Sequence, residues 1–400
     1  MSTSLIPHPL FRLGFRPLFL FGSLSAALMI GWWTLYWTSL GAGHGFNWSP
    51  VGGAVWWHAH EMVFGFTTAI IGGFLLTAVR NWTGVPTITG LPLAVLVLFW
   101  LAGRLVIAFG SGLNSAVILL VDQLYLVALM LAVGHPIIKA KMWRNLMFVP
   151  LLLMMAVLNG LSHGVHLAGD LAYYSLSAIH SGLLLVCLII AIIGGRVLPF
   201  FTANGLKIKK VDNLPWLDLI SILSLLCLVG LSLFGLQGFD PFFVGGLAMV
   251  SGLTNLLRFV RWQFWLTGKV SLLWSLHLFY SMLPLGLIAL GLERFGLVEG
   301  FSPVLHILTV GAVGGMILSM ITRVSLGHTG RPLLPSNAMV SAFLILMLGL
   351  LFRSLLPLVL PEQALSAVLY SGMCWTLAFV IFFVKQGPFL WTARPDDKAS

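Results

Sequence analysis

The chain has 400 residues, of which 59% are hydrophobic and only 8% are charged, and its mean hydropathy is +1.03. Because soluble domains carry roughly 25% charged residues, this composition excludes an ordinary water-soluble protein. The formal net charge of +10 follows from membrane topology, as shown below, so it gives no support to binding of nucleic acid. The three cysteines lie alone in separate apolar runs without C-x-x-C spacing, which argues against a thiolate metal cluster.

The sequence contains twelve apolar runs that are long enough to cross a membrane. A transmembrane helix needs about 20 mostly apolar residues to span a hydrocarbon core of roughly 30 Å. In chain order, the predicted helices cover 17–40, 55–79, 91–109, 113–138, 146–168, 172–198, 215–236, 240–262, 272–292, 302–323, 335–358 and 363–385. Residues 183–193 and 344–351 are apolar without the alternation of barrel strands. We therefore predict an all-α polytopic membrane protein, with residues 1–400 as a single transmembrane domain.

Basic residues occur in every second connection between the predicted helices. Arg12 and Arg16 precede the first helix, and acidic residues such as Asp240, Glu299 and Glu362 lie in the opposite loops. The basic residues in the later connections and at the end of the chain are Arg80, Lys139, Lys141, Arg144, Arg196, Lys207, Lys209, Lys210, Arg258, Arg261, Lys269, Arg323, Arg331, Lys385, Arg394 and Lys398. Since Lys and Arg are retained on the cytoplasmic side, we expect both termini in the cytoplasm.

Three of the even-numbered predicted helices share one layout. Each has a histidine in its outer half, then a Gly-Gly pair, then an arginine and a polar, glycine-containing segment at its cytoplasmic end. The histidines are His60, His180 and His306. The spacing is 120 and then 126 residues. A threefold repeat of four-helix units (1–145, 146–270 and 271–400) would bring these histidines together near the outer face. The alternative is that the glycine pairs only let helices approach closely.

The segment 56–62 (WWHAHEM) at the start of the second helix is the most informative stretch. At about 100° per residue, His58 and His60 point roughly 200° apart on a helix, so we expect them to serve opposite faces. An alternative is that both are interfacial residues in a Trp-rich belt. Glu61 is a carboxylate within the membrane that could relay protons, orient a ligating imidazole or pair with a basic group.

Further histidines lie at two depths. By the predicted topology, His166, His180 and His306 share the outer half with the second-helix pair, and His163 precedes His166 by three residues, a spacing that can share a helix face. His277 and His328 lie on the inner side and form a candidate second site; His328 is alternatively a turn residue. Neutral imidazole suits iron, copper and zinc, and haem iron takes axial histidine ligands.

Buried charges in other helices have structural and binding interpretations. Arg104 and Asp122, in adjacent helices, are expected to form an ion pair within the membrane, with a proton path as the alternative. Arg196, Arg323 and Arg331 lie beside the polar, glycine-rich exits. They could bind haem propionates or lipid phosphates, although positive-inside topology also accounts for them.

Short motifs are distributed along nearly the whole chain: 11–17 (FRLGFRP), 58–62 (HAHEM), 73–78 (GFLLTA), 81–84 (NWTG), 194–199 (GGRVLP), 201–202 (FT), 274–287, 306–311 (HILTVG) and 327–333 (GHTGRPL). These motifs resemble those of the NnrS family of bacterial membrane proteins. This resemblance implies an inner-membrane protein that binds haem b and copper. It also implies a link to nitric oxide metabolism or to protection from nitrosative stress.

The family pattern carries over to His58, His60, His277, His306 and His328. His166 lies where the family has an aromatic-His-Leu position, with a valine before it in this chain, and His163 and His180 do not match clearly. By similarity of layout to haem–copper oxidases and nitric oxide reductases, either histidine of the second helix would pair with His306 as an axial haem ligand.

We therefore expect the outer-half histidines to hold metal, with nitric oxide as a ligand. Whether the chain is a nitric-oxide-related oxidoreductase or a sensor stays open at this stage. The chain has no C-x-x-C-H attachment site, so a redox cycle would require an external electron donor. The alternative function is a transporter or metal-trafficking protein that uses intramembrane histidines.

Overall fold

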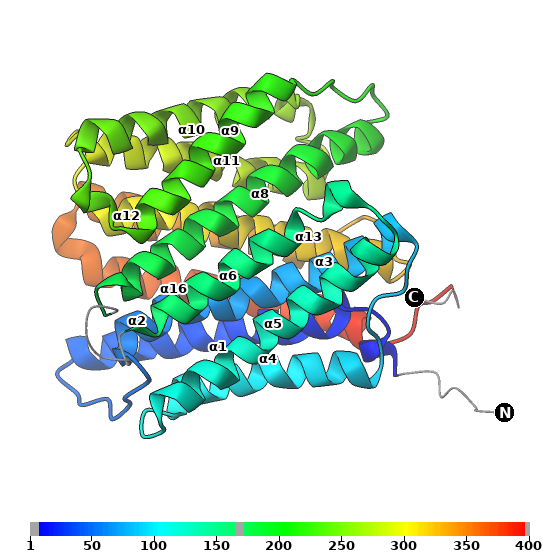
Figure 1. Cartoon of the computed structure of the whole chain (residues 1–400). Helices are drawn as coiled ribbons and strands as arrows, with labels where there is room; N and C mark the ends of the chain where they lie inside the picture. The colour runs from blue at the N-terminus through cyan, green and yellow to red at the C-terminus, as the bar shows by residue number, and fades with distance from the viewer. Residues whose placement is uncertain (1–7, 165–171, 397–400) are drawn as a thin grey trace.

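The computed structural model describes residues 8–164 and 172–396, and these residues form helices and connecting loops without a strand. Within this part of the chain, twelve helices are long and apolar enough to cross a membrane (Figure 1), which confirms the predicted number. In chain order they are α1 (Phe15–Gly41), α2–η2–α3 (Gly53–Thr83), α4 (Leu91–Phe109), α5 (Ser115–Lys139), η3–α6 (Trp143–Ser162), α8 (Tyr174–Leu206), α9 (Pro215–Leu233), α10 (Pro241–Arg261), α11 (Ser271–Arg294), α12–η7–α13 (Phe301–His328), α14–η8–α15 (Asn337–Val359) and η9–α16 (Pro361–Trp391).

The largest difference from the predicted boundaries is at the end of α8. The prediction ends this helix at Leu198, whereas α8 continues through Pro199 to Leu206 and ends where Lys207 adopts a left-handed conformation. A proline removes one backbone donor, but neighbouring helices and local adjustments tolerate this loss in membrane helices. Because of this extension, Phe200, Phe201 and the polar residues that follow them are helical and lie after Arg196 in α8.

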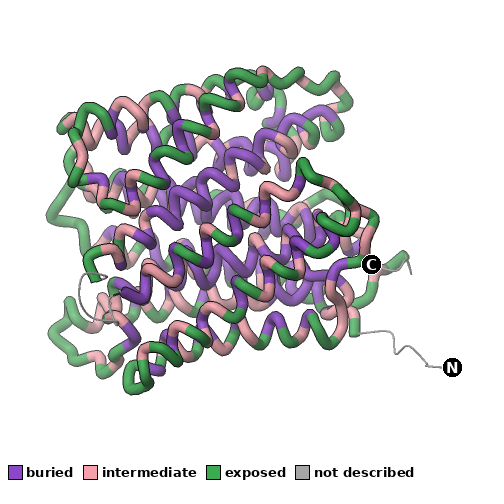
Figure 2. Tube along the Cα trace, in the orientation of Figure 1, coloured by how far each residue is buried: buried purple, intermediate pink, exposed green. Residues whose placement is uncertain are grey.

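Three spans form the centre of the bundle. In their most apolar windows, α2–η2–α3, α8 and α12–η7–α13 are 78%, 72% and 78% buried, whereas the next most buried span, α11, reaches 61%. The remaining spans pack around them, with α1 against α16, α4 against α5 and α10 against α11. Figure 2 shows the buried residues concentrated in the interior and the exposed ones on the outer helices. The central spans are those for which the sequence predicts equivalent positions.

Three spans contain a π-helical segment, in which the backbone is wider than an α-helix. These are η2 (Glu61–Thr67), η7 (Ile307–Gly314) and η8 (Leu351–Leu355). The first two begin immediately after His60 and His306. Single-turn π-bulges are rare and frequently lie at functional sites, so these segments direct attention to the space between them.

The glycine pairs of the central spans allow close packing of helices, which is the alternative interpretation to a threefold repeat. A Cβ atom on Gly194 would overlap the Tyr280 ring, and one on Gly314 would overlap Trp375. Gly315 is tighter still, because its Cβ would fall on the Phe279 ring. Packing therefore explains these glycines, and the threefold repeat stays a prediction.

This packing gives a matched pair of glycine variants. Gly315→Ala is expected to lower the free energy of unfolding by about 1–3 kcal/mol, because overpacking forces Phe279 or the helix to move. Gly246→Ala, on α10, is expected to be neutral, because nothing lies within 4 Å of its Cβ position. Thermal unfolding of both variants in the same detergent measures the difference. Equal unfolding temperatures would contradict the packing role.

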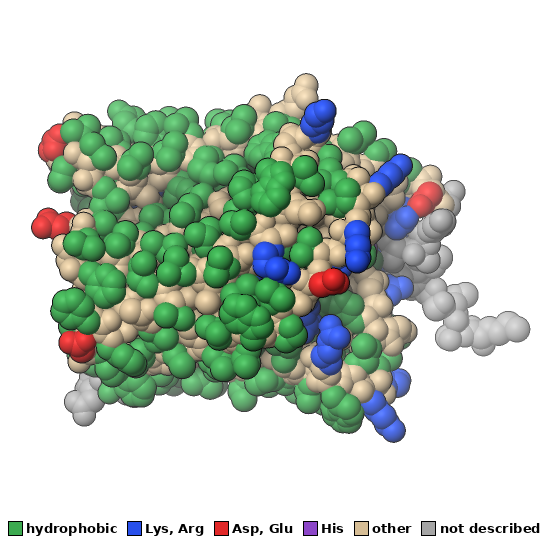
Figure 3. Space-filling model, turned by 90° about the horizontal axis from the view of Figure 1, so that it is seen from above, with side chains coloured by type: hydrophobic (Ala, Val, Ile, Leu, Met, Phe, Trp, Pro, Cys, Tyr) green, Lys and Arg blue, Asp and Glu red, His purple; other side chains and the backbone are tan. Residues whose placement is uncertain are grey.

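Charged side chains separate to the two ends of the bundle. In Figure 3, Lys and Arg gather at one end of the bundle, with some acidic side chains among them; acidic residues mark the opposite end, and hydrophobic side chains cover much of the surface between. We call these the basic end and the acidic end. At the first, Lys139 ends α5 and Lys269 lies in the loop before α11; at the second, Asp240 precedes α10 and Glu362 lies in η9. The geometry thus agrees with the alternating loop charges.

Candidate metal centre

A cavity of about 140 Å³, the histidine cavity, lies between the central spans near the acidic end. Side chains from all three π-helical segments line it. Its polar side chains include His58, His180, His306 and Arg353; the full lining is Ile30, Trp33, His58, Ala59, Met62, Val63, Phe66, Thr67, Ile179, His180, Leu183, Val186, Leu305, His306, Thr309, Val310, Val313, Arg353, Val368, Ser371, Gly372 and Trp375. One histidine thus comes from each central span into a mainly apolar space.

His58 is held against α1 by ring stacking. Its imidazole lies 4.3 Å from the Trp33 ring, centroid to centroid, at an interplanar angle of 10°. The His58 Nδ1 atom is buried and has no hydrogen-bond partner. A buried polar atom without a partner costs free energy, so this nitrogen is a natural position for a ligand to bind.

His306 is the last residue of α12, directly before η7. Its Nδ1 donates a hydrogen bond of 2.7 Å to the backbone carbonyl of Ser302. Metal-ligating histidines usually donate their other ring N–H to such an acceptor, which fixes the tautomer and the ring orientation. The Nε2 atom of His306 is therefore the nitrogen left available for a ligand.

The cavity is completed by His180 and Arg353. The His180 ring meets Phe301 edge to face at 5.3 Å. Arg353 Nη2 donates to Ser302 Oγ at 3.0 Å, and no carboxylate pairs with Arg353 in the part of the chain described here. An arginine without an acidic partner, facing an apolar cavity, favours an anionic group on a ligand.

His60 points away from this cavity, as the 200° separation predicts. It belongs to a fully buried group that we call the polar cluster, which consists of His60, Glu61, Arg104, Asp122, Asn159 and His163. The repeat aligned His60 with His180 and His306, but the structure places His58 with them instead. A shift of two residues in α2 therefore separates the histidine cavity from the polar cluster.

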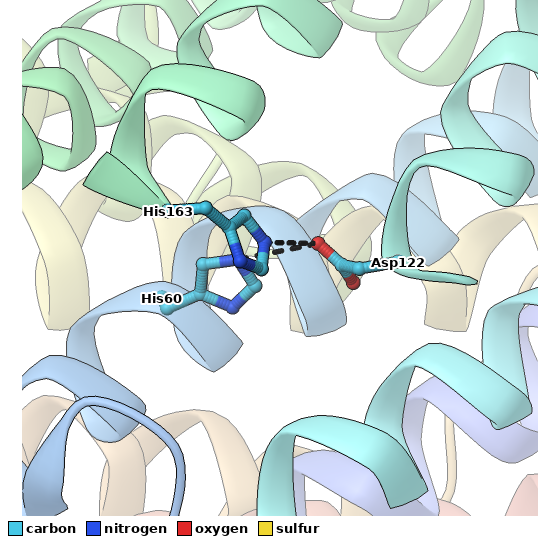
Figure 4. A group of neighbouring side chains, drawn as sticks. All are labelled: His60, Asp122 and His163. Atoms are coloured by element: carbon cyan, nitrogen blue, oxygen red, sulfur yellow. Dashed lines mark hydrogen bonds and ion pairs between the residues drawn. The ribbon is translucent and has the colours of Figure 1, made fainter. Parts of the chain in front are cut away.

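Asp122 is the centre of the polar cluster. Its Oδ1 accepts from Arg104, which confirms the ion pair predicted between these helices. Its Oδ2 lies 3.3 Å from His60 Nε2 and 3.2 Å from His163 Nε2, as Figure 4 shows. Asn159 Nδ2 donates to the same oxygen at 2.7 Å. One carboxylate therefore joins side chains from four spans.

Glu61 pairs with both basic groups beside it. Its Oε1 lies 3.2 Å from His60 Nδ1 and 3.1 Å from Arg104 Nη1. The backbone makes room for this arrangement at Gly65, where a Cβ atom would overlap the Arg104 guanidinium. Of the three roles open for Glu61, pairing with a base and orienting His60 both agree with this geometry.

Three donors in the polar cluster could hold a metal ion. His60, Asp122 and His163 each offer one ligand atom, and these atoms lie within 4.8 Å of one another. Two imidazoles and a carboxylate suit zinc or copper. On Asp122, Arg104 pairs only with Oδ1, whereas the histidines lie near Oδ2. The sequence did not reveal this group, because no spacing links residues on α2, α5 and α6; the one signal was the pairing of Asp122 with Arg104.

The inner-side histidines do not meet each other. His277 is buried in α11 and its Nε2 lies 2.8 Å from Thr202 Oγ1 on α8. His328 ends α13, where its ring lies 5.6 Å from Phe15 and lines a separate cavity at the basic end. His166 lies outside the described residues. The structure thus offers no shared inner site built from His277 and His328.

The two arginines predicted to bind a cofactor stack on aromatic rings. Arg323 Cζ lies 3.9 Å from the Phe201 ring centroid, and Arg331 Cζ lies 4.1 Å from that of Phe389. Neither lines the histidine cavity. Cation–π contacts of this kind are worth about 0.5–2 kcal/mol, so packing between helices already explains both side chains.

These features define a multi-pass helical membrane protein with an imidazole-lined cavity among its central spans. The family model described as NnrS protein matches residues 9–394. Because this match covers nearly the whole chain, the protein belongs to the NnrS family. No curated protein sequence matches the chain at a significant level.

Proposed function

We propose that this protein binds haem b and copper and that nitric oxide is the ligand of its haem. Membership of the NnrS family supports a link to nitric oxide. The observation that carries the proposal is the convergence of His58, His180 and His306 on one cavity bordered by three π-helical segments. Half-buried imidazoles in a mainly apolar space, one with an unpartnered Nδ1 and one oriented by a carbonyl, are suited to bind a metal.

The side chains of the histidine cavity have the chemistry to hold a haem, and the cavity, at about 140 Å³, would have to widen to admit the macrocycle. His58 and His306, from two central spans, are the histidines that would hold the haem iron, and His180 lines the same cavity. Arg353 supplies a cation without an acidic partner for a propionate. A haem held by these residues would supply iron that binds nitric oxide, which would have to displace one of the two imidazoles. The apolar lining excludes water and favours a small uncharged gas.

Copper is assigned to the polar cluster. His60, Asp122 and His163 provide the only group of three or more such donors in the described part of the chain. Arg104 pairs with Asp122, and Glu61 pairs with His60, so both proposed ligands are held in place. A metal ion there would take over the Asp122 oxygen that now accepts from the Asn159 amide.

A metal-specific variant tests this assignment. His163→Ala is expected to remove most of the copper and to leave the haem content unchanged, since His163 does not line the histidine cavity. Copper measured by elemental analysis and haem measured by pyridine haemochrome give the two values on one sample. His135→Ala, at an exposed position of α5, is the control. Full copper content in His163→Ala would show that the cluster is not the copper site.

The same charges support a membrane orientation. Lys and Arg favour the cytoplasmic side, so the basic end and both termini are placed in the cytoplasm and the histidine cavity near the outer face of a bacterial inner membrane. The lipid bilayer is then the main partner of the apolar surface. Turnover of nitric oxide would require electrons from an external donor, whereas sensing would not.

Transport of metal ions is less well supported than binding. An axial cavity of about 70 Å³ follows the histidine cavity along the central spans, sharing Thr67 and Val186 with it. Apart from Thr67, every side chain lining the axial cavity is apolar or glycine. An ion crossing this region would lose its hydration without gaining a ligand. Purified protein without a Soret band, after expression with ample haem, would reverse this preference.

A further inference from the structure

A cavity at the basic end has a lining of basic and aromatic side chains. This basic cavity, of about 700 Å³, lies among the ends of α3, α8 and α13 and the start of η3–α6. Its lining is Phe74, Thr77, Ala78, Asn81, Trp82, Met142, Arg144, Asn145, Phe148, Ile193, Arg196, Val197, Phe200, Phe201, Lys210, Asn213, Val324 and His328. None of these residues is Asp or Glu, so the positive charges face the cavity without compensation from its walls.

The contacts of Arg196 show that its surroundings lack an anionic partner. Its Nη1 donates to Asn145 Oδ1 at 3.4 Å, its Nη2 lies 3.1 Å from Met147 Sδ, and its Cζ lies 5.7 Å from the Phe148 ring centroid. All of these contacts are to uncharged groups, and the neighbouring Arg144 repels it. An anion between the two guanidinium groups would remove this repulsion and accept charge-assisted hydrogen bonds from both.

The basic cavity continues into an apolar passage. It shares Phe74 and Ile193 with the axial cavity, which runs on between the central spans as far as Val186. From Arg196 to Val186 the distance along α8 is about 15 Å, at 1.5 Å per residue. A small inorganic anion would leave this passage empty. The apolar lining suits a hydrocarbon chain, and the cavity, at about 70 Å³, would have to widen to admit more than a few methylene groups.

We propose that the two cavities together bind one phospholipid with an anionic headgroup. The headgroup lies among Arg144, Arg196 and Lys210, and one acyl chain enters the axial cavity past Phe74 and Ile193. The location agrees with the chemistry, since basic residues at the cytoplasmic boundary attract anionic lipids. The bilayer supplies such a ligand at high local concentration. This site does not depend on the proposed haem or copper.

The first test removes the charges from the cavity. The triple variant Arg144→Gln, Arg196→Gln, Lys210→Gln is compared with Lys139→Gln, Lys269→Gln, Lys385→Gln, which removes the same charge from exposed lysines outside both cavities. The full-length protein in detergent receives dioleoyl phosphatidylglycerol or dioleoyl phosphatidylcholine, and native mass spectrometry counts bound lipid. We expect the cavity variant to lose at least tenfold in affinity for phosphatidylglycerol, and the control to keep it. Equal binding by the two variants would overturn the proposal.

A second test addresses the acyl chain without changing charge. Ile193→Trp is expected to block the entrance to the axial cavity and to weaken binding of dioleoyl phosphatidylglycerol more than that of a short-chain phosphatidylglycerol. Inorganic phosphate at millimolar concentration is expected to displace neither lipid. Displacement by phosphate would show a free-anion site, and loss of haem instead of lipid from the charge variant would show a haem site; either result overturns the lipid assignment.

Discussion

Replacing His306 with alanine is expected to reduce the haem content of the purified protein by at least tenfold. His306 is the cavity histidine whose ring is already oriented by the Ser302 carbonyl, and no other side chain on its span offers an imidazole at that depth. His58→Ala is expected to give a similar loss, because both histidines would hold the proposed haem. The Soret band and pyridine haemochrome assay measure the effect on equal amounts of protein.

His277→Ala is the matched control for this loss. His277 is also a buried imidazole in a membrane span, but it hydrogen-bonds Thr202 and lies outside the histidine cavity. It should therefore keep its haem even if it is less stable. If His277→Ala loses haem and His306→Ala retains it, the haem lies on the inner side, and the assignment of the histidine cavity is wrong.

The membrane architecture could be predicted because its causes are local. Apolar runs of about 20 residues determine each span, and loop charges determine which end each helix begins from. The opposite directions of His58 and His60 follow from helix geometry alone. The pairing of Arg104 with Asp122 also follows locally, since adjacent helices joined by a short loop bring two costly buried charges together.

The composition of the site could not be predicted in the same way. Which histidine of α2 faces the cavity depends on the rotation of the whole span against α8 and α12, and π-helical segments change that rotation without a sequence signal. Asn159 was not singled out, because a lone asparagine near a helix end is commonplace. The structure shows it bridging His60 and Asp122. Contacts among distant spans carry no periodic pattern.

Replacing Arg104 with methionine is expected to lower the free energy of unfolding by about 3–5 kcal/mol, the usual cost of leaving a buried charge without its partner. Arg104 is only 7% exposed and contacts both Asp122 and Glu61. Its removal leaves two carboxylates close together inside the membrane, with only imidazoles to balance them. Unfolding by a denaturing detergent, followed by tryptophan fluorescence, measures the change.

The surface ion pair Arg394–Asp396 provides a control. It distinguishes burial from charge pairing as the cause of the expected loss of stability. Arg394→Gln breaks an ion pair of similar length at partly exposed side chains, and such pairs contribute about 0.2–1 kcal/mol. The double variant Arg104→Met, Asp122→Leu should recover part of the loss, because it removes one of the two carboxylates left without Arg104, while Glu61 keeps its contact with His60. If Arg104→Met costs no more than Arg394→Gln, water reaches the polar cluster. That result would also weaken the copper assignment, since the rigid, dry arrangement of His60, Asp122 and His163 depends on Arg104 holding the carboxylate.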